Sequence, residues 1–218
     1  MRRAKLDKLY GAVSGCRLPC ARCPGTRKSR LERPRGFLNG SRTGQAKVLV
    51  VGKNPGHPID EEHEFYRSSR NEPMSKLSAR FYEEALLRKN FLANTRGLTF
   101  HTRLMNYLRS ILNLTDTEIV RKVAFTNLVK CSTKDKTKQL HPITKHTCYE
   151  RFLSSEIQLI EPKVIIALGK EAFEFLDKNK DEHSVEQLAY LYHPSYHWPQ
   201  PGRKEGLKKA RRIFKRMV

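Results

Sequence analysis

Four short runs of aliphatic and β-branched residues, separated by segments with helical spacing, constrain the fold of this chain most strongly. They are KVLVVG (47–52), VAFTN (123–127), VIIALG (164–169) and LAYLYHPS (188–195). Such runs are too continuously apolar for strands with one face in water, and they are typical of parallel strands covered on both faces by helices. We therefore expect an α/β fold, a three-layer α/β/α sandwich around a central four-stranded, mainly parallel sheet.

Segments with apolar residues at helical spacing lie between these runs and supply the covering layers. The spacing predicts helices over residues 3–14, 74–91, 99–112, 149–160 and 170–176, and a basic C-terminal helix over about 203–217. The pair Glu161-Pro162 ends the fourth of these, because the residue before a proline avoids helical backbone. The chain shows no internal repeat, so we expect one domain over residues 1–218 that begins with a cysteine-bearing, basic segment, residues 1–46.

The net charge of +21 indicates a polyanionic partner. Each Lys or Arg over a phosphate releases a condensed counterion, so a large basic excess favours nucleic acid. A solvated charged surface is the alternative interpretation. The expected phosphate-binding face is the basic side of the C-terminal helix, with Lys204, Lys208, Lys209, Arg211 and Arg212.

The chain has no apolar run near the ~20 residues that a membrane helix needs, and its first residues lack the apolar stretch of a secretory signal. We therefore expect a monomer without a membrane partner, inside the cell, in the cytoplasm or nucleoid if the source is prokaryotic. In that reducing compartment the five cysteines favour a metal or cluster over disulfides.

Polar motifs follow three of the predicted strands. They are GKNPG (52–56), TNLVKC (126–131) and HPS (193–195). In an open parallel sheet, ligands bind beyond the carboxyl ends of the strands, so these motifs are expected to converge on one pocket. Any one of them alone is explained better as an ordinary turn, and only the three together indicate a pocket.

The order GxNPG, TNxVKC, PKVIIALG and HPS resembles the uracil-DNA glycosylase superfamily, over about residues 20–197. The resemblance implies a DNA-repair glycosylase that flips uracil, or a related deaminated or mismatched base, out of DNA and hydrolyses its N-glycosidic bond. By this likeness the first motif contacts the base and positions the attacking water, through Gly52, Asn54, Pro55 and Gly56.

The same resemblance implies roles for residues outside the first motif. Asn127 would read the Watson–Crick edge of the base. His193 would donate a hydrogen bond to the base oxygen on which negative charge develops. Ser195 would hold the adjoining phosphate.

Two further positions concern aromatic rings and the gap left by the flipped base. The family's stacking ring lies about eleven residues after the proline of the first motif, which selects Tyr66, with Phe65 as the neighbouring alternative. Packing of both rings in the core would also explain them. Relatives carry a wedge leucine where this chain has His197, and the adjacent Trp198 is the expected substitute, with loop packing as the alternative.

Lys53 and Asn54 depart from the pattern of the cluster-bearing relatives. Those enzymes carry Glu where this chain has Lys53, and Asn54 resembles the GINPG motif of the mismatch-specific branch, where Asn positions the water. Asn is no general base, so catalysis would rest on geometry and electrostatics. Lys53 is expected to contact phosphate or to attack the sugar carbon as a lyase amine. Glu61 or Glu62, otherwise a solvated acidic turn, would be substitute bases.

Four cysteines match the register of the iron–sulfur, thermostable (family-four) branch: Cys20, Cys23, Cys131 and Cys148. The resemblance implies that they hold a [4Fe–4S] cluster, and tetrahedral zinc is the chemical alternative. Cys16 has no role in this likeness.

Three other interpretations stay open at this point. Cys16, Cys20 and Cys23 also fit the CxxxCxxC motif of radical-SAM enzymes. Lys53 in place of Glu also fits a nucleic-acid-binding protein that keeps the fold without the chemistry. His141, at the end of TKQLH, corresponds to the histidine through which one branch cross-links covalently to the sugar. The preferred base and the choice between single- and double-stranded DNA also stay open.

Overall fold

A four-stranded parallel sheet forms the centre of the protein. The computed structural model describes residues 2–16, 46–56, 60–68, 72–87, 99–132, 139–183, 185–195 and 200–215. The strands are β1 (Val48–Gly52), β2 (Val123–Asn127), β3 (Val164–Leu168) and β4 (Gln187–Leu191). Their order in the sheet is β2-β1-β3-β4, and every pairing is parallel. The predicted α/β sandwich with a four-stranded parallel sheet is confirmed.

The burial of each strand follows from its place in the sheet. Every residue of β1, β2 and β3 is buried, whereas β4 is exposed at its first residue and half-buried at two others. Parallel neighbours need long crossover connections, and the helices in those connections cover both faces of the sheet. This is why the three inner strands read as continuous apolar runs.

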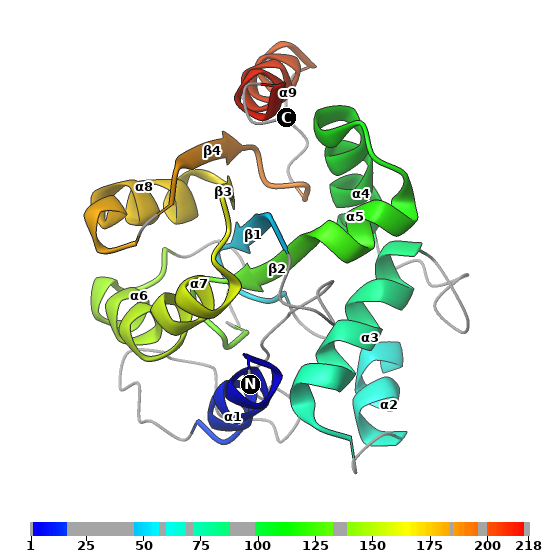
Figure 1. The fold of residues 1–218 in the computed structure, drawn as a ribbon, viewed down its shortest axis with the longest axis vertical. Helices are drawn as coiled ribbons and strands as arrows, with labels where there is room; N and C mark the ends of the chain where they lie inside the picture. The colour runs from blue at the N-terminus through cyan, green and yellow to red at the C-terminus, as the bar shows by residue number, and fades with distance from the viewer. Residues whose placement is uncertain are drawn as a thin grey trace.

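The helices form two layers around the sheet (Figure 1). Their bounds are α1 (Arg2–Ser14), α2 (Asp60–Ser68), α3 (Met74–Leu87), α4 (Thr99–Leu112), α5 (Asp116–Lys122), α6 (Pro142–Cys148), α7 (Ser154–Ile160), α8 (Lys170–Lys178) and α9 (Gln200–Lys215). Val48 and Val50 join a core built with α3, α4, α5 and α9, while Leu49 and Val51 join a core on the opposite face with α1, α7 and α8. No helix in the described part of the chain is long and apolar enough to cross a membrane.

Three helices were not predicted from the sequence. Residues expected as an acidic turn, including Glu61 and Glu62, form the first turn of α2, and Glu62 is buried rather than solvated. The short helix α5 begins at a capping box in which Thr115 and Glu118 satisfy each other's backbone N–H groups. α6 begins at Pro142, with the side chain of His141 as its cap.

Only the second half of the predicted helix over 149–160 is a regular α-helix. The segment opens with a π-helical turn, η3 (Tyr149–Leu153), which continues directly from α6, and α7 follows it. The helix ends at Glu161, which adopts the left-handed conformation with φ of 51° before Pro162. Wide π turns are frequent at functional sites, and this one directly follows Cys148.

Candidate active site

The carboxyl ends of β1 and β2 remain paired beyond the sheet. The backbone N–H groups of Leu128 and Val129 donate to the carbonyl oxygens of Gly52 and Lys53, at 2.8 and 3.0 Å. The first motif and the TNLVKC segment therefore lie side by side, as the sequence predicted for polar groups that follow neighbouring strands.

Asn127, the last residue of β2, is packed directly over Gly52. A Cβ atom on residue 52 would lie 2.5 Å from Oδ1 of Asn127 and 3.6 Å from Cζ of Phe125, so only glycine fits there. Asn127 is 3% exposed, and its Nδ2 has no hydrogen-bond partner within the described part of the protein. A buried amide without a partner costs free energy, so this arrangement suits a ligand that accepts the hydrogen bond.

The first motif turns away from β1 at Asn54 and Pro55. Asn54 is half-buried and its Nδ2 donates to the carbonyl oxygen of Pro55 at 3.1 Å. With Nδ2 engaged in the turn, Oδ1 is the atom that would accept a hydrogen bond from a water. Pro55 is buried and Gly56 is exposed.

The ends of β3 and β4 bring His193 to the same edge. The N–H of Gly169 donates to the carbonyl oxygen of Leu191 at 2.7 Å, and Gly169 has φ of 89°, a conformation that favours glycine. A Cβ atom at that position would lie 3.5 Å from Cβ of His193. The chain that follows β4 therefore passes close to the beginning of α8.

His193 is a neutral hydrogen-bond donor at neutral pH. Its Nδ1 accepts the backbone N–H of Ser195 at 3.2 Å, so the ring proton of the neutral form lies on Nε2. Burial, and secondarily the charge of Lys53, lower the pKa of His193 to about 4. Ser195 itself is exposed.

Lys53 is paired with Glu171, a residue that the sequence analysis did not single out. The Nζ of Lys53 lies 2.9 Å from Oε2 of Glu171, and the Nζ of Lys145 lies 3.3 Å from Oε1. The backbone N–H of Leu140 also donates to Oε1, at 2.8 Å. The side chain of Lys53 is therefore engaged by a carboxylate on α8.

Helix α4 contributes two residues that the sequence analysis also missed. The ring of Phe100 lies 5.3 Å from the ring of His193 and 5.8 Å from that of Phe125, centroid to centroid. Arg103, one helical turn further, donates to the carbonyl oxygen of Pro194 at 3.0 Å. The helical spacing of apolar residues predicts only that Phe100 lies on the buried side of its helix. The fold shows that this side faces the strand ends.

The two rings expected to stack on the base pack mainly against the protein. Phe65 is 4% exposed and lies 5.3 Å from the ring of Phe81. Tyr66 is half-buried against the same core, and its hydroxyl donates to that of Ser78 at 3.5 Å. Of the rings in the described residues, Phe100 is the one in contact with His193.

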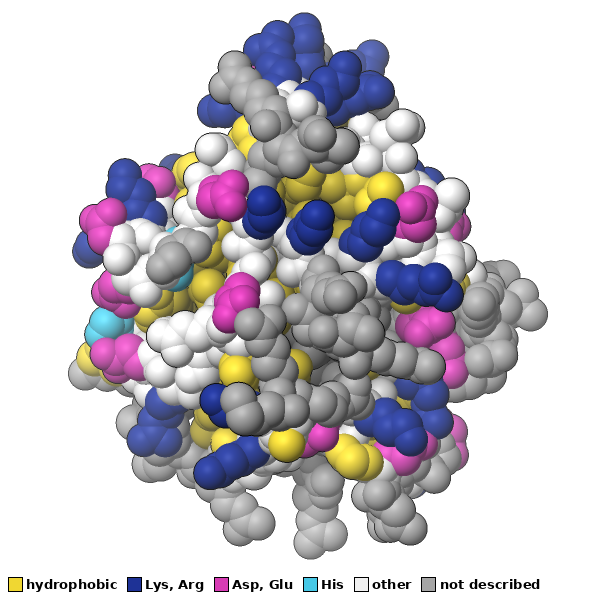
Figure 2. Space-filling model, in the orientation of Figure 1, with side chains coloured by type: hydrophobic (Ala, Val, Ile, Leu, Met, Phe, Trp, Pro, Cys, Tyr) yellow, Lys and Arg dark blue, Asp and Glu magenta, His cyan; other side chains and the backbone are white. Residues whose placement is uncertain are grey.

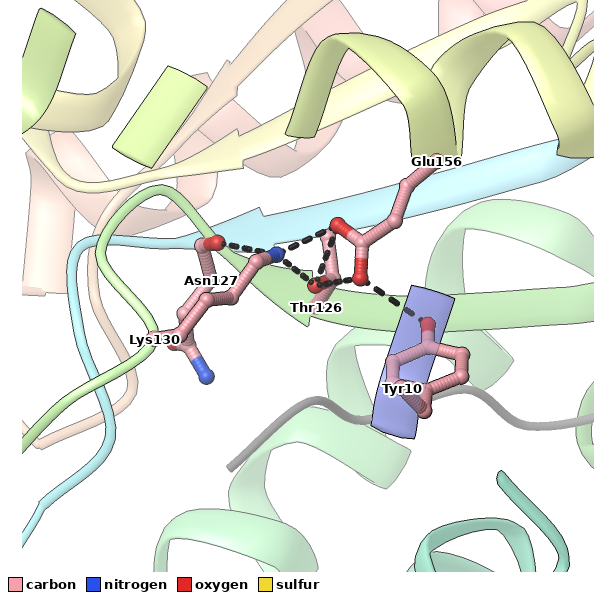
Figure 3. Close-up of polar contacts among 5 residues, drawn as sticks. All are labelled: Tyr10, Thr126, Asn127, Lys130 and Glu156. Atoms are coloured by element: carbon pink, nitrogen blue, oxygen red, sulfur yellow. Dashed lines mark hydrogen bonds and ion pairs between the residues drawn. The ribbon is translucent and has the colours of Figure 1, made fainter. Parts of the chain in front are cut away.

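A buried ion pair lies beneath this edge of the sheet (Figure 3). Lys130 and Glu156 contact each other with side chains 1% and 0% exposed. The Nζ of Lys130 also donates to Oγ1 of Thr126 at 2.6 Å and to the carbonyl oxygen of Asn127 at 2.8 Å. Tyr10 of α1 donates to Oε1 of Glu156 at 2.9 Å. Burial lowers the pKa of Lys130, and the charge of Glu156 opposes that shift.

This network fixes the residue that would read the base. Because Lys130 is held by Glu156 and Thr126, its hydrogen bond to the carbonyl of Asn127 sets the last peptide of β2. The contact between Asn127 and Gly52 then sets the amide. The sequence analysis did not single out any member of this ion pair.

The cysteines expected to hold a cluster are described only in part. Cys131 is half-buried and Cys148 buried, and both pack against the same core as Cys16. Cys20 and Cys23 lie outside the described residues. Within the described ranges, no three His, Cys, Asp or Glu side chains are placed together to hold a metal ion.

The C-terminal helix places basic side chains near the candidate site. Gly202 and Gly206 of α9 lie against Tyr192, the residue before His193. A Cβ atom on Gly202 would lie 3.2 Å from the hydroxyl oxygen of Tyr192, and one on Gly206 would lie 3.6 Å from its ring. Figure 2 shows Lys and Arg side chains gathered over α9 at the top of the molecule. The exposed basic residues of this helix are Lys204, Lys208, Lys209, Arg211, Arg212 and Lys215. His197 and Trp198 lie outside the described residues.

The comparison with protein families identifies the family of this chain. Residues 40–215 match the model of the Uracil DNA glycosylase superfamily, so the chain belongs to that superfamily. No curated protein sequence matches the chain. Family membership indicates glycosylase activity on DNA.

The buried ion pair gives a prediction about stability. Lys130→Met leaves the carboxylate of Glu156 buried without a cation, and we expect the free energy of unfolding to fall by about 3–5 kcal/mol. Replacing both partners, as Lys130→Met with Glu156→Leu, removes the unpaired charge and restores most of the loss. Denaturant unfolding measures both changes. Lys122→Met, which breaks an exposed ion pair with Glu118, is the control and leaves the midpoint nearly unchanged. A double variant as unstable as the single one contradicts this account.

Proposed function

We propose that this protein is a DNA glycosylase that flips a deaminated base, uracil or a related mismatched base, out of DNA and hydrolyses its N-glycosidic bond. One observation carries the proposal: the buried amide of Asn127, without a partner for Nδ2 in the described protein, shares the carboxyl edge of the sheet with Asn54 and neutral His193. Membership of the superfamily supports the activity class.

The amide of Asn127 has the chemistry to read a pyrimidine edge. It presents a donor and an acceptor together, and uracil presents a carbonyl oxygen beside a ring N–H. The packing over Gly52 keeps this amide in place without a bound base. Phe100, in contact with His193 and Phe125, is the ring best placed to lie against the flipped base.

The reaction requires charge stabilisation more than proton transfer. The bond between the sugar carbon and the base nitrogen breaks, and its electron pair leaves with the base. Nε2–H of His193 donates to the base oxygen that gains negative charge, which is an oxyanion-hole arrangement. Oδ1 of Asn54 orients the water that bonds to the sugar carbon. The proton lost by that water ends on the released base, so the hydrolysis balances.

The DNA backbone would lie across α9 and the segment after β4. The exposed cations of α9 provide the phosphate contacts, and Ser195, exposed beside His193, is placed to meet a phosphate next to the flipped nucleotide. We expect the protein to act as a monomer on intracellular DNA. Because phosphate contacts release counterions, binding should weaken steeply as salt increases.

We also propose that Cys20, Cys23, Cys131 and Cys148 hold a [4Fe–4S] cluster. Cys131 and Cys148 fit this role because both pack on one core layer, and the charge of Lys130 lies close enough to Cys148 to interact with it. A bound cluster would supply a covalent link between these segments. Ser132, next to Cys131, donates to the carbonyl oxygen of Gly56 at 2.9 Å, so such a link would also steady the first motif.

Anaerobic purification tests the cluster. We expect about four iron and four sulfide per chain and broad visible absorbance, all lost in Cys131→Ala and in Cys148→Ala. Cys16→Ala is the matched control and retains the iron. One zinc per chain without sulfide would replace this proposal with a structural zinc site. A cluster that depends on Cys16 but not on Cys148 would contradict it.

A panel of lesions tests the glycosylase function. Oligonucleotides with uracil, hypoxanthine, xanthine or a T mismatch, single- and double-stranded, are incubated with the protein and cleaved with alkali at abasic sites. We expect breaks at uracil or a related deaminated base, and their loss in Asn127→Ala and Asn54→Ala. Binding without breaks across the whole panel would identify a glycosylase-fold binding protein. A covalent adduct that survives denaturation and needs His141 would identify the cross-linking chemistry.

Gly52→Ala tests the position of Asn127 separately. The added methyl group meets Oδ1 of Asn127 at 2.5 Å and must displace the amide. We expect excision to fall on the order of 10²-fold, as misplacement of a reading group does, while the protein remains folded. Gly11→Ala, where the methyl group meets open space in α1, is the control. Equal excision by both variants would show that Asn127 does not read the base.

A further inference from the structure

Lys53 carries a positive charge directly after β1, at the edge of the sheet that bears the candidate site. We propose that Lys53 is a catalytic residue whose ammonium stabilises the negative charge of the departing base, and that Glu171 is the residue that positions it. This inference rests on the proposed glycosylase function. It concerns a position at which this chain departs from the pattern of the cluster-bearing relatives.

The backbone of Lys53 is fixed at the edge of the sheet. Its carbonyl oxygen accepts the N–H of Val129 at 3.0 Å, directly beyond the pair formed by Gly52 and Asn127. The side chain of Lys53 is 23% exposed, and its Nζ lies 2.9 Å from Glu171. The ammonium is therefore held at the site rather than extended toward a distant phosphate.

The effect of Lys53 on His193 shows where its field acts. The same positive charge that disfavours a proton on His193 favours negative charge on the atom to which Nε2 donates. Lys53 is the charge that lowers the pKa of His193 after burial, and Arg103 of α4 donates to the carbonyl oxygen of the next residue, Pro194. Both are cations, so they favour an anion beside the ring.

Glu171 positions Lys53 without cancelling its charge. Oε2 of Glu171 contacts Lys53, while Oε1 is occupied by Lys145 and by the N–H of Leu140. The described members of this cluster, two ammonium groups and one carboxylate, sum to a net charge of +1. Glu171 also lies in the first turn of α8, whose amino end adds positive potential at this edge.

With Lys53 in this role, the rate enhancement arises at the departing base rather than at the sugar. A carboxylate at position 53 would stabilise the sugar as it becomes cation-like, and it would also accept a proton from water. An ammonium does neither, but it stabilises the base as the electron pair leaves with it. Catalysis therefore depends on stabilising the departing base. Excision of a base that leaves easily should depend least on Lys53.

Single-turnover excision from uracil and from 5-fluorouracil in the same oligonucleotide tests this dependence. Fluorine stabilises the base anion by itself. We expect Lys53→Met to slow uracil excision on the order of 10²-fold, and to slow 5-fluorouracil excision clearly less. Lys53→Arg retains part of the rate, because it keeps the charge. Glu171→Gln shows the same preference for the better leaving group, with a smaller loss.

Lys170→Met is the matched control. Lys170 is exposed on α8 next to Glu171 and pairs with Glu174, so its removal leaves both rates unchanged. Histidine NMR provides a readout apart from activity: Lys53→Met should raise the pKa of His193 from about 4 toward its ordinary value, without reaching it, because burial is the larger cause. Unfolding midpoints, with Lys53→Arg as the second variant, show that each protein is folded.

Three results would overturn the inference. An equal rate loss for both bases with weaker DNA binding would make Lys53 a phosphate contact. Borohydride trapping of DNA that depends on Lys53 would make it a nucleophilic amine. Unchanged rates in Lys53→Met would leave it without a catalytic role. If the wild-type protein excises neither uracil nor any other base of the panel, the proposed function itself fails.

Discussion

The ion pair between Lys130 and Glu156 is the interaction on which the arrangement of the site depends. Both side chains are almost completely buried, so each would be costly alone, and the pair persists because further hydrogen bonds satisfy it. Tyr10 links α1 to this pair through its hydrogen bond to Glu156 of α7. Lys130 in turn donates to the carbonyl oxygen of Asn127. Elements far apart in the sequence, α1 and α7, are thereby fixed against one peptide at the end of β2. A hydrophobic substitute for the pair would pack well, but it would not define where that peptide lies.

A parallel sheet explains why residues far apart in sequence share one site. The four strands end at the same edge, and each delivers a different chemical group: Lys53 and Asn54 from β1, Asn127 from β2, Glu171 after β3 and His193 after β4. The short pairing beyond Gly52 and the hydrogen bond from Gly169 to Leu191 extend the order of the sheet into these ends. The groups are therefore placed by backbone hydrogen bonds as much as by their side chains, which limits how far any of them moves without a ligand.

The sequence was most informative where burial is complete. The predicted strand over 123–127 and helix over 99–112 have the same bounds in the structure, because inner strands and amphipathic helices carry unbroken patterns. The helices α2, α5 and α6 were missed because they are short and polar. The sequence signals for two of them lie at the helix starts: a capping box at Thr115 for α5 and Pro142 for α6. The pairing of Lys53 with Glu171 has no local signal, since the two residues meet only after β1 and β3 become neighbours. Tyr66 was chosen by its distance from Pro55, with Phe65 as the alternative, and in α2 Phe65 is buried whereas Tyr66 is half-buried.

The charges at the strand ends explain why a lysine is compatible with the first motif. A second carboxylate beside Glu171 would repel it, whereas a cation pairs with Glu171 and keeps His193 neutral. Neutral His193 in turn can donate from Nε2 to a base oxygen at neutral pH. Lys53, Glu171 and His193 are thus mutually consistent, and changing Lys53 to Glu alone would place two carboxylates where one is already satisfied. The substitution of the expected glutamate by lysine is therefore one part of a wider arrangement of charges that favours an anion at this edge of the sheet.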